Sequence, residues 1–172
     1  MIVKAIIEIP QGSANKYEVN PVTGQIRLDR VLYSATYYPV NYGFIPASWG
    51  EDNDPLDILV LASTSIHPGV EVDVRVIGTL LMTDEHGPDA KIVGVADADP
   101  RWGHVTVLDD VGVHRLREIR HFFSTYKELQ GLPVTMGDYE GMDTAQRLIG
   151  EAFQRYQNRQ AERGELDDRS DY

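Results

Sequence analysis

The sequence of 172 residues contains no cysteine. Disulfide bonds, thiol catalysis and cysteine-ligated zinc sites are therefore excluded, and the absence agrees with a reducing compartment. A chain of this length buries about 68–70% of the surface that its unfolded form exposes, so a hydrophobic core can stabilise it without cross-links.

Basic residues are few, with 16 Lys and Arg against 27 Asp and Glu and a formal net charge of -11. This balance argues against a nucleic-acid partner or a membrane-attracted surface. We expect an anionic partner to be met locally, by a few placed cations or by metal ions.

Long hydrophobic runs are also missing. The N-terminal apolar run is interrupted by Glu8 and Pro10 before a signal-peptide core could form. Residues 31–50 carry no formal charge, but Pro39 and Pro46 make them a poor membrane span. We therefore predict a cytoplasmic protein without a membrane partner.

Alternating or β-branched segments recur through the first hundred residues, separated by Gly, Pro, Asn and Asp. They predict a closed or rolled sheet. From Val113 the apolar spacing changes to threes and fours, which predicts a helix ended by Gly131 and Pro133. Its apolar positions are Leu116, Ile119, Phe122, Phe123, Tyr126 and Leu129.

A second amphipathic helix is predicted to begin near Asp143. Its apolar positions are Ala145, Leu148, Ile149, Ala152, Phe153 and Tyr156. Residues 164–172 form an acidic tail without an apolar pattern, and we expect it to fray. Without an internal repeat or a linker, residues 1–163 are predicted to form one domain.

The segment EDNDPLDIL, residues 51–59, concentrates three aspartates. In an extended chain Asp52 and Asp54 point to one side, with Cα atoms about 6.5 Å apart, and Pro55 bends the chain so that Asp57 can join them. A solvated turn is the alternative for each aspartate alone. An EF-hand is excluded by Leu56 at its fifth position, so convergence favours a hard cation, Mg²⁺ or Mn²⁺.

A second acidic turn, TDEHGPDAK, holds Asp84, Glu85 and Asp89, and alone it reads more readily as a hairpin tip. His86 in this turn could ligate a metal or act as an acid-base group, but without a second histidine at ligand spacing an exposed loop histidine is favoured. Taken singly, Lys16, Lys91 and the other basic residues are typical of surface charges. The segment YYPVNYGF suits a packed corner as well as a set of phenolic donors.

The ordered motifs EIP, NKYEV, LDR, YPVNYGF, DNDPLDIL, TDEHGPDAK and HFFSTYKEL resemble those of the family I soluble inorganic pyrophosphatases of bacteria. The family pattern D-x-D-P-x-D matches at Asp52, Asp54, Pro55 and Asp57. The turn around His86 and the run DPRWGH look more like the actinobacterial branch.

This resemblance implies a mainly β, α+β fold: a five-stranded OB-like closed barrel with additional strands and two flanking C-terminal helices. It further implies a homo-oligomer, commonly a hexamer. The implied activity is Mg²⁺-dependent hydrolysis of pyrophosphate to two phosphates, with Mn²⁺ or other divalent ions as substitutes.

Site residues follow from the same resemblance. Asp54 matches the general base that takes a proton from a metal-activated water, Tyr42 matches the phenol near that base, and Tyr38 has a supporting role. The matched metal-binding residues are Glu8, Glu18, Asp52, Asp57, Asp84 and Asp89. The matched phosphate donors are Lys16, Arg30, Lys91, Tyr126 and Lys127.

Two other classes stay open on the residues alone. One is a non-catalytic acidic OB-like module that binds divalent ions or a protein. The other is a nucleotide pyrophosphohydrolase of another fold, although the sequence has no GxxxxGK[ST] loop. Hydrolysis of nucleoside triphosphates would distinguish the second class.

Overall fold

Nine strands and two long helices make up the chain in a computed structural model that describes residues 1–20 and 22–168. The strands are β1 Ile2–Ile9, β2 Asn15–Val19, β3 Ile26–Val31, β4 Asn41–Phe44, β5 Asp57–Leu61, β6 Glu71–Asp84, β7 Gly87–Pro88, β8 Lys91–Ala96 and β9 Thr135–Glu140. The helices are α1 Val113–Thr125 and α2 Met142–Asp168, with short 3-10 turns at Pro100–Trp102, Leu108–Val111 and Glu128–Gln130.

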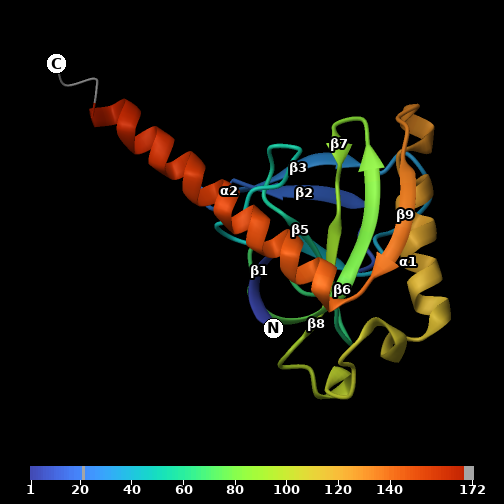
Figure 1. The fold of residues 1–172 in the computed structure, drawn as a ribbon. Coiled ribbons are helices and arrows are strands. Elements are labelled where there is room, and N and C mark those ends of the chain that lie inside the picture. The colour runs from blue at the N-terminus through green and yellow to red at the C-terminus, as the bar shows by residue number, and fades with distance from the viewer. Residues whose placement is uncertain (21, 169–172) are drawn as a thin grey trace.

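Five strands close into a ring (Figure 1). The order is β1-β4-β5-β8-β6, and β6 returns to pair with β1. Only the β5–β8 pairing in this ring is parallel. The β2–β3 hairpin forms a separate small sheet, while β7 and β9 extend β6 beyond the ring. The predicted mainly β fold with a closed five-stranded OB-like barrel is confirmed.

Alternating side chains of the barrel strands enter two different apolar clusters, as the two-residue period of a strand requires. In β5, Leu59 and Leu61 pack in a cluster that contains the buried face of α1. Ile58 and Val60 lie in a second cluster that contains the buried face of α2. Both faces of β5 are therefore buried, which explains its uninterrupted apolar run.

Gly43 allows β4 to lie against β1. It pairs with Ile7, and a Cβ at this position would lie 1.9 Å from the main-chain oxygen of Ile6. Any larger residue would force the two strands apart. The strand at Asn41–Phe44 lies within the segment YYPVNYGF, for which the sequence predicted a packed corner or a set of phenolic donors and no strand.

The first helix is shorter than the apolar spacing predicted. It ends at Thr125, and Gly131, with a φ of 71°, ends the separate 3-10 turn that follows Lys127. Leu129 is 65% exposed, so no burial of this side chain stabilises a longer helix. The early end instead leaves Tyr126 and Lys127 buried next to the strands.

The second helix begins at Met142, close to the predicted start, and buries Ala145, Ile149 and Ala152. It crosses the barrel and continues past it (Figure 1). Residues 164–168 are helical and residues 169–172 lie outside the described part, so the fraying expected for residues 164–172 stays a prediction. Among the described helices, none has the length and apolar composition needed to cross a membrane.

Candidate active site

One cleft collects the predicted site residues. All of them except Tyr38 line a cavity of about 750 Å³ at one end of the barrel. They come from β1, the β2–β3 hairpin, β4, the loop before β5, the start of β5, the β6–β7 turn, β8 and the end of α1. The cleft also contains residues that the sequence did not single out as site residues: Val19, Asn20, Arg27, Phe44, Trp49, Pro55, Glu85 and His86.

The acidic segment before β5 is a tight turn rather than the extended chain that was predicted. The N–H of Gly50 donates to the Asp54 carbonyl at 2.6 Å, and the N–H of Asp54 donates to Asp52 Oδ1 at 3.2 Å. Asn53 has a φ of 70°, a left-handed conformation that Asn tolerates. A turn and a cation site were alternatives for this segment in the sequence. The structure makes them compatible, because the turn places both Asp52 and Asp54 on the wall of the cleft.

Asp57, at the start of β5, is the centre of a buried polar group. Its carboxylate accepts hydrogen bonds from the Tyr42 hydroxyl and the Lys91 ammonium. Lys91 also donates to Asp89 and is 2% exposed. Burial alone would lower the pKa of Lys91, but the carboxylates of Asp57 and Asp89 raise it above its usual value, so the lysine stays charged.

A second lysine occupies the other side of the cleft. Lys127 donates to Asp84 Oδ2 at 2.8 Å and to both oxygens of Glu85 at 2.9 Å. Burial would raise the pKa of Asp84, but the Lys127 bond and the His86 N–H lower it overall. The β6–β7 turn is thus both the predicted hairpin tip and a contributor of carboxylates. His86 lines the cleft with a side chain that is 71% exposed.

The β2–β3 hairpin supplies charges to the third side of the cleft. Lys16 donates to Glu18 at 2.9 Å and to Asp29 at 3.1 Å, and Arg27 forms a two-pronged pair with Glu18. Arg30 pairs with Asp29 at 2.7 Å. Cations and carboxylates therefore alternate along this wall.

Glu8 is the most strongly perturbed carboxyl group of the cleft. Burial raises its pKa to about 7, against the lowering effect of the Val19 N–H that it accepts at 2.9 Å. Asp57 adds a further raising effect. Burial likewise raises the pKa values of Asp52 and Asp89. A cation that enters the cleft would stabilise the ionised form of these carboxyl groups and so lower their pKa values.

Tyr38 lies behind the cleft wall. It is 1% exposed, and its ring makes an edge contact with the Tyr42 ring at 5.5 Å and a tilted contact with Phe122 at 4.8 Å. The segment YYPVNYGF therefore combines both alternatives, since Tyr38 packs in the corner and Tyr42 donates into the cleft.

The donor set fits a hard divalent cation. The cleft carries carboxylate oxygens and no thiolates, and Lys91 and Lys127 each bridge two acidic side chains, so these pairs are close enough to share a cation. In the described part of the chain, no three acidic or histidine side chains form a preassembled ligand cluster.

Glu85, Arg27 and Trp49 are cleft residues that sequence reasoning missed. Glu85 lies between matched motif positions and had been considered only as part of a turn, while Arg27 stands two residues from Asp29 in the strand IRLDRV. Trp49 carried no local signal, because its contacts are with helix α2, more than a hundred residues later.

Comparison with known proteins agrees with this geometry. A family model described as inorganic pyrophosphatase matches residues 5–157. The chain is 48% identical over 155 residues to the inorganic pyrophosphatase of Geobacillus stearothermophilus, covering 90% of this chain and 94% of the relative. It is 53% identical over 129 residues to that of Thermus thermophilus, covering 75% and 74%.

Solved structures are similar over the same length. The Thermus thermophilus inorganic pyrophosphatase superposes with a TM-score of 0.87 at 46% identity, covering 91% of each chain. The Helicobacter pylori inorganic pyrophosphatase gives a TM-score of 0.88 at 38% identity, covering 91% of this chain and 94% of the other. The family match over residues 5–157 includes the barrel strands and the first part of α2.

Proposed function

The chain belongs to the inorganic pyrophosphatase family, and on this premise we propose that it hydrolyses inorganic pyrophosphate to two phosphates. The observation that carries the proposal is the single cleft in which matched acidic and basic residues from separate parts of the fold meet. A non-catalytic module of the same fold finds no support in the comparisons.

Members of this family depend on metal ions, and we propose Mg²⁺ as the ion used by this chain. The residues that would hold it are Glu8, Glu18, Asp52, Asp57, Asp84 and Asp89, all of which line the cleft. When bound, divalent ions neutralise phosphate oxygens and lower the pKa of water toward about 7.

Asp54 is the proposed general base. Its main-chain groups hold the acidic turn, while its side chain is exposed in the cleft. A carboxylate held in this way can accept the proton of an attacking water within hydrogen-bond reach. Tyr42 supports the neighbouring Asp57, and burial raises the pKa of Tyr42, so its hydroxyl stays protonated and donates.

The cationic residues have the complementary role of binding phosphate oxygens. Arg30 can present two parallel N–H donors to a phosphate, and Lys16, Lys91 and Lys127 add point charges. Tyr126 lies beside Lys127, whose Nζ is 5.7 Å from the ring centroid. Positioned donors of this kind stabilise the charge that grows on the leaving phosphate.

Phosphate release from pyrophosphate, with Mg²⁺ and with a chelator, tests the proposal. We expect rapid release with Mg²⁺, loss of release with the chelator, and little release from ATP under the same conditions. Release from ATP at a comparable rate would identify a nucleotide hydrolase instead, and no release from pyrophosphate would refute the proposal.

The assembly and the location are further proposals. A homohexamer and a cytoplasmic location follow from the resemblance to bacterial relatives, and the exposed apolar side chains of the β2–β3 hairpin, among them Ile26 at 45% and Leu28 at 54%, leave surface for a neighbouring copy. Light scattering on the purified chain checks the hexamer, and a monomeric mass would overturn it.

A further inference from the structure

Helix α2 holds the residue from which the acidic turn starts. The N–H of Trp49 donates to the Ala152 carbonyl at 3.0 Å, and the Trp49 carbonyl accepts from Arg155 Nε at 2.8 Å. The guanidinium of Arg159 lies 4.1 Å from the Trp49 ring centroid. Three successive turns of α2 therefore hold one residue by its N–H, its carbonyl and its side chain.

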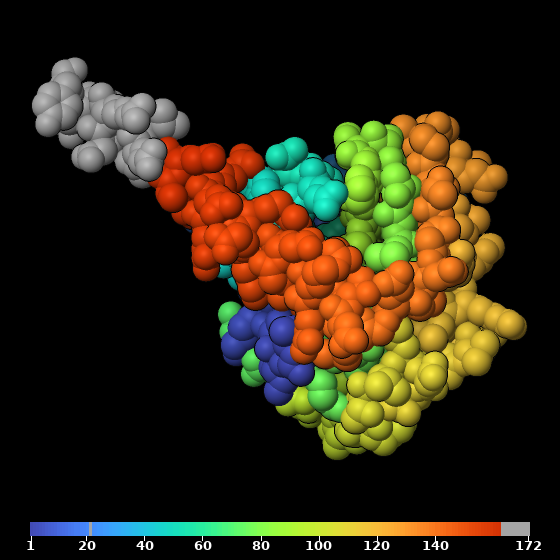
Figure 2. Space-filling view, viewed as in Figure 1, coloured from blue at the N-terminus to red at the C-terminus, as the bar shows by residue number. Residues whose placement is uncertain are grey.

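Stacking is the main restraint on the Trp49 ring. Its indole N–H is buried and has no hydrogen-bond partner among the described protein groups. A guanidinium over an indole face contributes about 0.5–2 kcal/mol, depending on its desolvation. In Figure 2 the chain around residue 50, in cyan, lies directly against α2 beside the green β6–β7 hairpin.

The anchored residue adjoins the carboxylates of the cleft. Gly50 follows Trp49 and donates to Asp54, and a Cβ on Gly50 would lie 2.5 Å from Asp52 Oδ1. The turn is thus closed on its own start by the Gly50–Asp54 hydrogen bond, with the Asp52 carboxylate lying close against Gly50. A displacement of Trp49 would move Asp52 and Asp54 with it.

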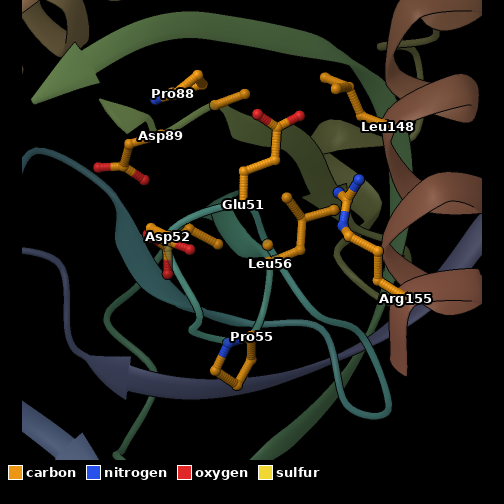
Figure 3. A pocket seen from close by; sticks show the side chains of 11 residues that line it. Glu51, Asp52, Pro55, Leu56, Pro88, Asp89, Leu148 and Arg155 are labelled. Carbon is orange, nitrogen blue, oxygen red and sulfur yellow. The ribbon is translucent and has the colours of Figure 1, made fainter. Parts of the chain in front are cut away.

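A small cavity separates α2 from the back of the turn. Figure 3 shows Arg155 and Leu148 entering it from the helix, Glu51, Asp52 and Leu56 from the loop, and Asp89 from the connection between β7 and β8. Side chains from α2 and from the acidic turn therefore face each other across this cavity.

We propose that Arg155 and Arg159 are positioning residues that, with Ala152, clamp Trp49 and so hold Asp52 and Asp54 in their working geometry. This inference rests on the proposed pyrophosphatase function. It assigns a role in the reaction to the C-terminal helix, whose side chains do not touch the reacting atoms.

Removal of either arginine would have two effects of opposite sign on the affinity for Mg²⁺. Loss of a positive charge beside carboxylates would strengthen cation binding by Coulomb's law. Loss of the clamp would weaken cation binding, because outer residues that orient metal ligands are worth about 10–100-fold in metal affinity or activity. Weaker Mg²⁺ binding in the variants would therefore support a positioning role, whereas tighter binding would indicate only the loss of a positive charge.

The test compares the full chain with Arg155→Ala, Arg159→Ala and Arg147→Ala. Arg147 is the matched control, an α2 arginine that pairs with Glu151 at 3.0 Å and is 59% exposed. We expect the first two variants to raise the half-saturating Mg²⁺ concentration by about tenfold and to lower kcat. The control should match the wild type, and Arg155→Lys, which keeps a donor for the carbonyl, should recover most of the loss.

A second readout needs no substrate. The chain has two tryptophans, so Trp102→Phe leaves Trp49 as the only indole fluorophore. Its emission should respond to Mg²⁺ in that background, and the response should move to about tenfold higher Mg²⁺ in the two clamp variants. This readout stays informative for variants whose activity is too low to measure.

The outcomes separate the inference from the function. If the wild type hydrolyses pyrophosphate and both alanine variants keep its Mg²⁺ dependence, or bind Mg²⁺ more tightly, the clamp is wrong and the function stands. If Arg155→Ala unfolds, Arg155→Lys takes its place in the test. An Arg155→Lys variant that does not recover the Mg²⁺ affinity would also show that the clamp is wrong. A wild type without hydrolysis overturns both.

Discussion

Asp57 and Lys91 meet because they are the first residues of two neighbouring parallel strands, β5 and β8. The register pairs Ile58 with Ile92, so the residues just before them lie side by side at the edge of the barrel. The Lys91 ammonium donates to the Asp57 carboxylate across a separation of 34 positions in the chain. The parallel pairing thus builds the centre of the cleft.

Replacement of this lysine tests the buried pair. Lys91→Met keeps much of the side-chain volume but leaves Asp57 and Asp89 without their shared cation. Breaking a buried pair in this way costs about 3–5 kcal/mol. We expect a lower urea midpoint without metal and a smaller difference from the wild type in Mg²⁺, which can neutralise the two carboxylates.

Lys4→Met is the control, because Lys4 pairs with Glu71 and Asp73 on the surface with a side chain that is 56% exposed. Little change is expected for it. Equal stability of Lys91→Met and the wild type in the absence of metal would show that the buried pair is not important for folding.

Asp54→Asn tests the general base. The amide keeps the shape of the side chain but cannot accept the proton, so kcat should fall by about 10²–10⁴-fold, the range for general acid-base groups. The half-saturating Mg²⁺ concentration should change little. Asp138→Asn, at a side chain that is 94% exposed, is the control. An unchanged kcat and pH profile in Asp54→Asn would assign the proton to another group.

Tyr42 and Tyr38 form a matched pair for testing the phenol. Tyr42→Phe removes the hydroxyl that donates to Asp57, and hydrogen bonds to charged groups contribute about 1.5–3 kcal/mol. We expect a clear loss of kcat/KM. Tyr38→Phe keeps the buried ring contacts with Tyr42 and Phe122 and should remain close to the wild type. Similar losses in both would indicate that packing, and not the hydroxyl, is responsible.

Acid stability should depend on Asp110. Its carboxylate accepts from the Thr106 and Val107 N–H groups at 2.8 and 3.1 Å, and these bonds hold its pKa below the usual value. A lowered folded-state pKa stabilises the protein above the unfolded value of about 3.9, and that stabilisation is lost as pH falls through the folded value.

Urea unfolding at neutral pH and at about pH 2.5 compares the wild type with Asp110→Ala and with Asp109→Ala as a neighbouring control. The wild type should exceed Asp110→Ala at neutral pH, and the gap should shrink in acid. A gap that stays constant or widens in acid would contradict the role of the ionised carboxylate.

Local chemistry determined a large part of this protein from the sequence alone. The alternating segments predicted β5, β6 and β8, the apolar stripe placed the start of α2 to within one residue, and the D-x-D-P-x-D pattern identified the acidic segment before β5. These features depend on neighbours within a few positions, so the residue types carry them directly. The match of spaced motifs to a known family then named the cleft residues.

Only the tertiary structure decided which of those residues touch. Strand pairing brought Lys91 to Asp57, the early end of α1 brought Lys127 to Asp84 and Glu85, and the path of α2 brought Arg155 to Trp49. Each contact joins residues that are at least 34 positions apart in the sequence, beyond the range of any helix or strand periodicity. The sequence therefore identified the charged residues of the cleft, whereas the ion pairs that they form depend on the closed barrel.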